Sequence, residues 1–427
     1  MKERWRPWWP STAPSTWSER DSVRNDPSVR RLALSFGLFS VLISVVDKLF
    51  GTGYILRMNE QGLGPAEIAF VLTLGSVVLA VVDFPAGNLA DQWGRKRTAA
   101  AGAVLVGSGL LVYGIATGAP GFVVAMTLWA AGMALITGAP TAWLVDRLES
   151  AGAGARRTSV LSRAATISMI AGALAALLVG APLLGHGAHL VLFTAAALAF
   201  VTAAVLLVGE DNRDPQGRLA NLPATVWTNA RLVVRDPTMR LVLYKSALVH
   251  IGFTSFLLSY QLFATQELGL PESGIGVVLA GSIAAMAVGT WLAGLLNRRW
   301  GLAALSATGV LACVAGYLTM SLAPHWSLWA AGLVCYEIGL GLDLMAFGSW
   351  LHDLVPAEKR TSWTSARSSI QTLVGVVGTL GAGGLISVFG FREVWLAATA
   401  ITALALLPLL ALRRRVAVPA QFEESLS

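Results

Sequence analysis

The sequence predicts an all-α integral membrane protein of twelve transmembrane helices, arranged as two pseudo-symmetric six-helix bundles. Three observations support this prediction: a low charge content, twelve apolar runs long enough to cross a bilayer, and a repeat between the two halves. Charged residues make up only 13% of the 427 residues, whereas soluble domains carry about 25%. Such a chain needs a bilayer as part of its solvent.

A helix needs about 20 consecutive apolar residues to span the hydrocarbon. Runs of this size occur near 31–56, 66–90, 98–118, 121–145, 159–183, 188–208, 239–264, 273–296, 301–323, 326–350, 362–389 and 392–412. They divide the chain into an N-terminal tail (1–25), a first bundle (26–208), a linker (209–238), a second bundle (239–412) and a C-terminal tail (413–427).

The basic residues predict the orientation. With both termini cytoplasmic, the basic clusters fall in inner segments, and the outer loops and helix ends hold only Arg57 and Arg392. This asymmetry follows the positive-inside rule, so we expect a multi-pass protein of the plasma membrane with both tails and the linker inside. Because the net charge of +7 is spread over short loops, it does not indicate binding of nucleic acid.

The two halves repeat one another. Displacing the first half by 207 positions superposes Trp143 on Trp350 and Asp146 on Asp353. The same displacement pairs further residues: Gly62 with Gly269, Ile68 with Ile275, Gly87 with Gly294, and Gly94 with Gly301. Two parallel six-helix repeats predict a pseudo-two-fold bundle with a substrate path between the halves.

The loop after the second apolar run carries a signature. Residues 87–97 read GNLADQWGRKR, which resembles the motif G-x-L-A-D-R/K-x-G-R-K/R of the major facilitator superfamily. Only the first basic residue is missing, because Gln92 takes its place. Helix count, halves and linker fit the same superfamily, so the resemblance covers essentially the whole chain and implies an alternating-access transporter.

The resemblance also implies a conformational latch. Asp91 and Arg95 would link the second helix to the fourth and the eleventh, with Asp146 as the partner on the fourth helix and the start of the eleventh near Thr361. The glycines would permit close helix approach and a tight turn. The expected latch residues are Gly87, Asp91, Gly94, Arg95, Arg97 and Asp146. In the second half Arg298 stands where the motif has Asp, so we expect a weaker latch there.

Two further features favour export. The stretches 83–87 and 138–146 resemble a branch of superfamily permeases commonly assigned to efflux. The fifth apolar run contains Gly172, Gly180, Pro182 and Gly185, similar to the antiporter motif of drug–proton exchangers. Here an alanine separates Gly180 from Pro182, which are adjacent in that motif.

Charged residues inside the membrane form two layers. Counting about 1.5 Å per helical residue, an inner layer lies roughly 9–12 Å from the cytoplasmic ends. It offers one acid–base pair in each half: Asp83 with Arg163, and Asp343 with either Lys245 or Arg367. Charges at such depth cost free energy and usually pair or line a cavity, so these residues are paired or cavity charges, with Asp83 and Asp343 also candidates for proton coupling.

A deeper layer contains Glu337, His250 and the neighbouring Asp47 and Lys48. Glu337 and Asp47 have no acidic counterpart in the other half, which indicates function rather than shared architecture. Burial of a carboxyl group favours its protonated form, so we expect Glu337 or Asp47 to couple transport to protons. The alternative is that Glu337 simply pairs with a cation such as Lys48. Expected substrate-cavity residues are His250, Tyr54, Gln261 and Tyr336.

The leading hypothesis is proton-coupled efflux of a small amphiphilic molecule. The alternatives are a proton-coupled symporter for nutrient uptake and, more distantly, a membrane-embedded sensor or enzyme. We find no nucleophile elbow, phosphate loop or metal-ligand spacing, so we expect no catalytic residues, no metal and no cofactor, with a proton gradient as the energy source. Cys313 and Cys335 lie inside apolar runs, which is typical of small buried hydrophobic residues. The expected partners are the substrate and the lipid bilayer, for a monomer.

Overall fold

The computed structural model describes residues 27–137, 139–208, 236–355 and 360–424. The expected N-terminal tail and nearly all of the expected linker lie outside these residues. The first half contains α2 (Pro27–Glu60), α3 (Pro65–Trp93), α4 (Arg95–Ile115), α5 (Gly118–Ile136), α6 (Ala139–Ser150), the 3-10 turn η1 (Gly154–Arg156), α7 (Arg157–Ala175), the π turn η2 (Ala176–Gly180), α8 (Ala181–Leu184) and α9 (Ala188–Leu207).

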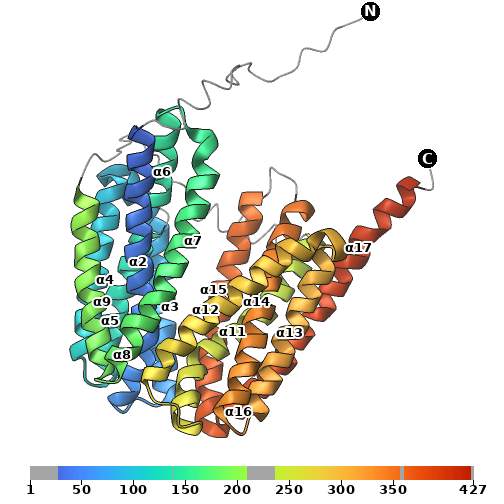
Figure 1. The fold of residues 1–427 in the computed structure, drawn as a ribbon. Coiled ribbons are helices and arrows are strands. Elements are labelled where there is room, and N and C mark those ends of the chain that lie inside the picture. The colour runs from blue at the N-terminus through green and yellow to red at the C-terminus, as the bar shows by residue number, and fades with distance from the viewer. Residues whose placement is uncertain (1–26, 138, 209–235, 356–359, 425–427) are drawn as a thin grey trace, which may run out of the picture.

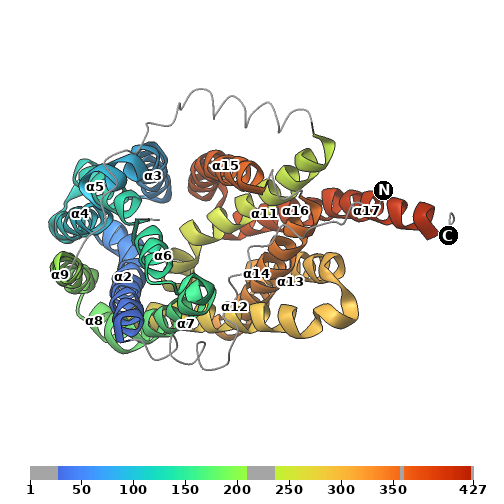
Figure 2. The same cartoon turned by 90° about the horizontal axis from the view of Figure 1, so that it is seen from above.

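The second half repeats this order. It contains α11 (Pro237–Leu262), the π turn η3 (Phe263–Glu267), α12 (Ser273–Trp300), α13 (Leu302–Leu322), α14 (Trp326–Leu354), α15 (Arg360–Phe389), α16 (Phe391–Leu404) and α17 (Leu406–Glu424). The two halves form two groups of helices, visible from the side in Figure 1 and from above in Figure 2.

The described residues contain 12 helical segments long and apolar enough to span a membrane, which confirms the prediction. An even number of crossings returns the chain to the side where it started, and α2 begins at the end of the molecule where α17 finishes (Figure 1). Helix α17 runs on to Glu424, through most of the segment that was expected to form the C-terminal tail.

Three spans expected as continuous helices are interrupted, each beside a proline. Proline lacks the N–H that would bond to the carbonyl four residues earlier, and its ring crowds that carbonyl. Pro140 follows the break between α5 and α6, Pro182 follows the π turn η2, and Pro408 follows the break at Ala405 between α16 and α17. The helices therefore bend or step inside the bundle instead of running straight.

Glycines let two helix pairs approach closely, in the same way in both halves. A Cβ on Gly102 of α4 would lie 2.7 Å from the carbonyl oxygen of Gly132 on α5. Displaced by 207 positions, Gly309 of α13 and Gly339 of α14 are related in the same way, also at 2.7 Å. Small residues at such crossings allow backbone contact, which is how helices associate in lipid. The repeat in the sequence is therefore a repeat in packing.

The surface of the bundle is apolar. Large hydrophobic side chains are exposed on several helices, among them Val81 on α3, Ile170 on α7 and Leu295 on α12. In water a surface of this kind would cause aggregation, whereas hydrocarbon solvates it. Since each helix satisfies its backbone hydrogen bonds internally, these faces can lie against lipid.

We predict that Gly309→Ala destabilises the protein by about 1–3 kcal/mol, because the added methyl group overpacks the contact of α13 with α14. Thermal unfolding of the purified protein in detergent measures this effect. Gly348→Ala on α14 is the matched control, since a Cβ there meets nothing within 4 Å. Equal unfolding temperatures for the two variants would contradict the packing argument.

Candidate functional site

A cavity of 590 Å³ lies between the two halves. Helices α2, α3 and α5 of the first half and α11, α12 and α15 of the second contribute its walls. Its lining consists of Asp47, Lys48, Phe50, Gly51, Tyr54, Leu72, Gly75, Ser76, Leu79, Met126, Trp129, His250, Phe253, Thr254, Leu257, Leu258, Tyr260, Leu279, Ser368, Gln371, Thr372, Gly375 and Thr379. The volume is in the range of small-molecule sites, about 300–1,000 Å³.

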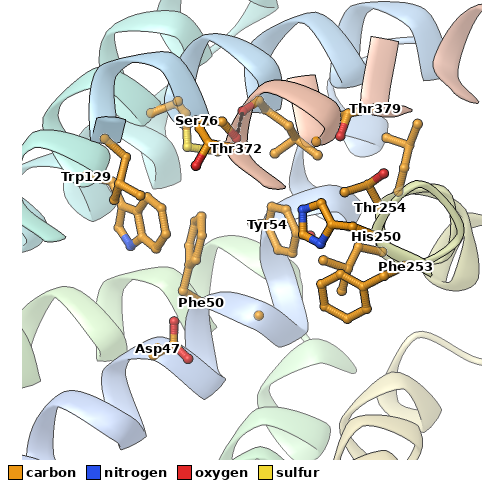
Figure 3. A pocket seen from close by; sticks show the side chains of 18 of the residues that line it. Asp47, Phe50, Tyr54, Ser76, Trp129, His250, Phe253, Thr254, Thr372 and Thr379 are labelled. Atoms are coloured by element: carbon orange, nitrogen blue, oxygen red, sulfur yellow. Dashed lines mark hydrogen bonds between the residues drawn. The ribbon is translucent and has the colours of Figure 1, made fainter. Parts of the chain in front are cut away.

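Aromatic rings from the first half form part of the wall (Figure 3). Phe50 stacks on Trp129 with ring centroids 4.6 Å apart, and its centroid lies 4.8 Å from that of Tyr54. Phe50 and Tyr54 are four residues apart on α2, so they occupy the same face of that helix. Trp129 reaches them from α5. Together the three rings offer a continuous apolar surface to a ligand.

Polar side chains from the second half supply another part of the wall. Ser368, Gln371, Thr372 and Thr379 share one face of α15 at helical spacing, and all four line the cavity. His250 enters from α11 beside Gly375, where an added Cβ would lie 3.1 Å from the imidazole Nε2. Gly375 therefore leaves room for the His250 ring at the cavity surface.

The only charged residues of the described lining are Asp47 and Lys48, and they pair with each other. Lys48 Nζ donates to Asp47 Oδ2 at 2.7 Å, and about a third of each side chain is exposed. Two neighbouring residues on α2 thus neutralise one another at the cavity wall, so the pair adds no net charge to the site.

The structure brings together some of the expected cavity residues and separates others. Tyr54 and His250 line the cavity, as do Asp47 and Lys48. Gln261 and Tyr336 do not line it, so that expectation is wrong for both. Gln261 is fully buried between the halves, and Tyr336 packs against Tyr317 inside the second bundle, with ring centroids 4.6 Å apart. Neighbouring side chains cover both of these residues.

The polar face of α15 was not among the residues predicted from the sequence. Its signal was readable, because serine, glutamine and threonine recur at helical spacing through an otherwise apolar run. What one sequence does not reveal is the rotation of that helix toward the other half.

Glu337 lies on α14 and is buried, with 7% of its surface exposed. It is outside the lining of the central cavity, and it forms no ion pair with the residues that the structure describes. The expectation that Glu337 pairs with Lys48 is therefore wrong, because the Lys48 ammonium group forms its ion pair with Asp47. An unpaired charge is costly at this depth, which keeps Glu337 among the candidates for a proton-binding group.

Asp343 is tied into a buried cluster. Both of its carboxylate oxygens accept from Lys245 Nζ, at 2.6 and 2.5 Å, and Ser306 donates to Oδ1 at 2.6 Å. The Lys245 ammonium also lies 3.8 Å from the Phe347 ring centroid, and the Arg367 guanidinium lies 5.6 Å from it. Asp343 thus contacts Lys245, one of its two expected partners, and this cluster holds α11, α13 and α14 together.

The pairing expected in the other half does not form. Asp83 on α3 and Arg163 on α7 are both exposed, and no ion pair or hydrogen bond joins these two described residues. Their positions along the helices suggested the pair, but the rotation of each helix decides whether the side chains meet. The inner charge layer is therefore asymmetric, because the expected acid–base pair forms in the second half and not in the first.

The signature motif forms a compact charge cluster at the end of the molecule where α2 begins. Arg95 donates to Asp146 Oδ2 at 2.5 Å and to Asp91 Oδ1 at 3.4 Å. These contacts join α3, α4 and α6 within the first half. Gly94 has φ +104° and connects α3 directly to α4, a conformation in which glycine avoids the strain of a Cβ. Its counterpart Gly301 has φ +74°.

The expectations about the motif differ in outcome. At Gly87 a Cβ would meet nothing within 4 Å, so the expected close helix approach is wrong there in this conformation. Arg97 is exposed at the same end. The expected contact with the eleventh helix stays a prediction, because the side chains of residues 360–366, Thr361 included, lie outside the described ones. Arg298, at the degraded copy of the motif, is exposed and forms no ion pair with described residues.

The halves contact one another toward the end opposite the one where α2 begins. Gln266 Nε2 donates to Asn59 Oδ1 at 2.9 Å, and Gln261 Nε2 donates to the Gly51 carbonyl oxygen at 2.7 Å. Gly276 of α12 packs against Ala181 of α8. The hydrogen bonds between described residues of the two halves all lie toward this end, and the helices of the two halves diverge toward the other (Figure 1).

An acidic pair borders this closed end. Glu272 lies in the loop before α12, and burial together with the nearby Glu60 carboxylate raises the pKa of Glu272. Glu60 belongs to the first half and Glu272 to the second. Protonation of Glu272 therefore removes a like-charge repulsion across the contact between the halves.

Comparison with known proteins decides the family. The model of the Major Facilitator Superfamily matches residues 32–262 and 243–426. This chain belongs to the major facilitator superfamily. A search of curated proteins found no match.

Solved structures of other transporters share the fold of this superfamily member. The nucleoside transporter NupG has a TM-score of 0.75 at 14% identity, over 89% of this chain and 98% of that one. A bacterial homologue of the human lysosomal transporter Spinster, inward-facing and occupied, has 0.74 at 17%, over 91% and 98%. A bacterial homologue of the iron transporter ferroportin, inward-facing, has 0.71 at 14%, over 90% and 98%. At these identities the likeness establishes the fold alone.

We predict that Asp343→Asn lowers the free energy of unfolding by about 3–5 kcal/mol, because it leaves the Lys245 ammonium buried without its counter-ion. The double variant Lys245→Leu/Asp343→Leu should recover much of the loss. Thermal or denaturant unfolding in detergent measures both. Glu149→Gln is the control, since its exposed contact with Arg157 spans 3.9 Å and should contribute about 1 kcal/mol or less. A loss for Asp343→Asn no larger than this control would contradict the assignment.

We also predict that joining positions 59 and 266 stops transport. In the variant Asn59→Cys/Gln266→Cys, a short bifunctional thiol reagent should hold the closed end shut and reduce flux by about tenfold or more, by preventing the conformational change. Cleavage of a disulfide-containing linker should restore flux. Each single cysteine variant is a control for Cys313 and Cys335, which are free. Undiminished flux in the cross-linked protein would show that this end does not open during transport.

Proposed function

We propose that this chain is a secondary active transporter that works by alternating access and exports a small amphiphilic molecule in exchange for protons. One observation carries the proposal: a single cavity lined by both halves, with the halves hydrogen-bonded to each other toward one end only among the described residues. A cavity between two rocking units is reached from one side at a time, and related folds use this geometry.

The charges at the opposite end support the cycle. The cluster of Asp91, Arg95 and Asp146 lies within one half in the present conformation. When that end closes, the same groups come within reach of the start of α15, whose N-terminal dipole favours an acidic partner such as Asp91. Basic residues concentrate at this end, so the positive-inside rule places it in the cytoplasm. Within this proposal we therefore take the present conformation as an inward-facing state.

The position of the fifth span supports exchange. Gly172 packs against Ser44 of α2, and Gly180 lies near Thr52 of the same helix. On its other side, Ala181 contacts Gly276 of α12 in the second half. The glycine- and proline-containing segment is thus a sliding surface between the halves, where small residues permit close approach.

Two acids are proposed for proton coupling. Asp47 lines the cavity, where cargo and protons have access to the same carboxylate. Glu337 is buried in the second bundle without an ion-pair partner among described residues. Asp343 is a weaker candidate because Lys245 and Ser306 occupy its oxygens, and Asp83 lies outside the cavity lining.

We predict that Glu337→Gln and Asp47→Asn identify the coupling group. Proteoliposomes loaded with a pH-sensitive dye report proton movement when amphiphilic compounds are added under an imposed pH gradient. The variant that replaces the coupling acid should lose coupled proton flux by about tenfold or more, equivalent to about 1.4 kcal/mol or more. Ser387→Ala on α15, outside the cavity lining, is the control.

The direction of coupling separates export from uptake. Protons that move against the cargo support exchange, and protons that move with it support the alternative, a nutrient symporter. Full gradient-driven transport in both acid variants would exclude Glu337 and Asp47 as coupling groups. Transport that an uncoupler leaves unchanged would refute proton coupling altogether.

A further inference from the structure

We infer that the cavity binds an uncharged compound with a planar aromatic ring and a hydrogen-bonding edge. This inference rests on the proposed function only in taking that compound as the cargo. It is carried by the division of the cavity wall into a ring surface, a set of unpartnered polar groups, and a self-neutralised charge pair.

The ring surface selects for a flat apolar ligand face. Phe50, Tyr54 and Trp129 lie with neighbouring centroids 4.6 and 4.8 Å apart (Figure 3). Aromatic rings bind other aromatic rings in offset-stacked or edge-to-face arrangements, with a gain beyond the area they bury. A saturated ring or an acyl chain would bury area here but would not obtain this gain.

Among the polar groups at the cavity that have no hydrogen-bond partner among described residues are the Tyr54 hydroxyl, the His250 imidazole and the Gln371 amide. They come from α2, α11 and α15, so both halves contribute. Between them they offer donors and acceptors. By contrast, the Thr254 hydroxyl donates to its own helix at Ile251. Polar groups left open in a largely apolar cavity fix the orientation of a ligand.

The charges of the wall argue for an uncharged ligand. Asp47 and Lys48 satisfy one another at 2.7 Å, so a cationic ligand would have to displace Lys48 from Asp47, and an anionic ligand the reverse. The buried Lys245 is likewise occupied by Asp343 and does not line the cavity. Transfer of an unpaired ion into such a site is costly. A neutral ligand avoids this cost.

The first test is binding to the full-length purified protein in detergent, by calorimetry and thermal shift. The probes are adenosine, riboflavin and naringenin as neutral aromatic compounds. Ribose and ribitol have the sugar or polyol of the first two probes without the aromatic ring system. Ethidium and 2-naphthoate are aromatic ions. At least one neutral aromatic probe should bind and raise the melting temperature, and each non-aromatic counterpart should bind about tenfold more weakly or not at all.

The second test uses variants of the wall. Trp129→Leu and Phe50→Leu should weaken binding of the aromatic probe about tenfold, and Gln371→Leu about fivefold. Trp326→Leu is the matched control, because this tryptophan lies outside the central cavity and is exposed. Melting temperatures of the unliganded variants show that each is folded. Equal losses in the control and the wall variants would overturn the assignment of the ring surface.

Three results would overturn the inference: no neutral aromatic probe binds, ribose or ribitol binds as tightly as its aromatic counterpart, or an aromatic ion binds more tightly than every neutral probe. None of these measurements needs transport. If a neutral aromatic probe binds but no gradient moves it, the inference about the ligand stands and the proposed transport function fails.

Discussion

The structure depends on how closely its helices can approach one another, because the surrounding lipid provides no hydrophobic force that would join them. In hydrocarbon, apolar side chains gain nothing from leaving lipid, so association relies on contact between backbones. The glycine contacts of α4 with α5 and of α13 with α14 provide this contact at equivalent places in the two halves. Each half is thereby a unit whose helices keep their relative positions.

The cavity follows from these two units. Within each half, charged contacts join several helices: the buried Lys245, Asp343 and Ser306 tie three helices of the second bundle together, and the more exposed motif residues tie three helices of the first. Between the halves the contacts are fewer and made by amides and small residues. Such an interface can separate without breaking a buried ion pair, which would cost several kcal/mol.

The fold was largely predictable because the bilayer imposes simple rules on a sequence. The length of apolar runs predicted the twelve spans, and one offset predicted the repeat. Helices that were expected to be continuous are broken or widened beside Pro140, Pro182 and Pro408. These interruptions could have been predicted, because proline disrupts helical hydrogen bonding at any such position. The same offset also pairs Gly102 with Gly309 and Gly132 with Gly339, so the repeated helix contact is readable in the amino-acid order.

The site was harder to predict because depth along a helix is easier to read than rotation about it. Of the expected cavity residues, Tyr54 and His250 line the cavity, but Gln261 and Tyr336 lie in packed contacts. Glu337 was expected near Lys48, yet lies in the other bundle without contacting it. A difference of one residue turns a side chain by about 100° around the helix axis. A small error in the assumed rotation of a helix therefore places a buried side chain at the cavity wall, or the reverse.

Adjacent opposite charges on one helix have an electrical consequence. As the halves reorient, Asp47 and Lys48 travel together, and the charge they carry across the field sums to zero. The membrane potential does work of about 2.3 kcal/mol per unit charge per 100 mV, and on this pair it does none. In the proposed exchange, with Asp47 ionised, the return of the empty carrier is therefore not opposed by voltage through the cavity wall, and one proton bound at Glu337 is enough to make the cycle electrogenic.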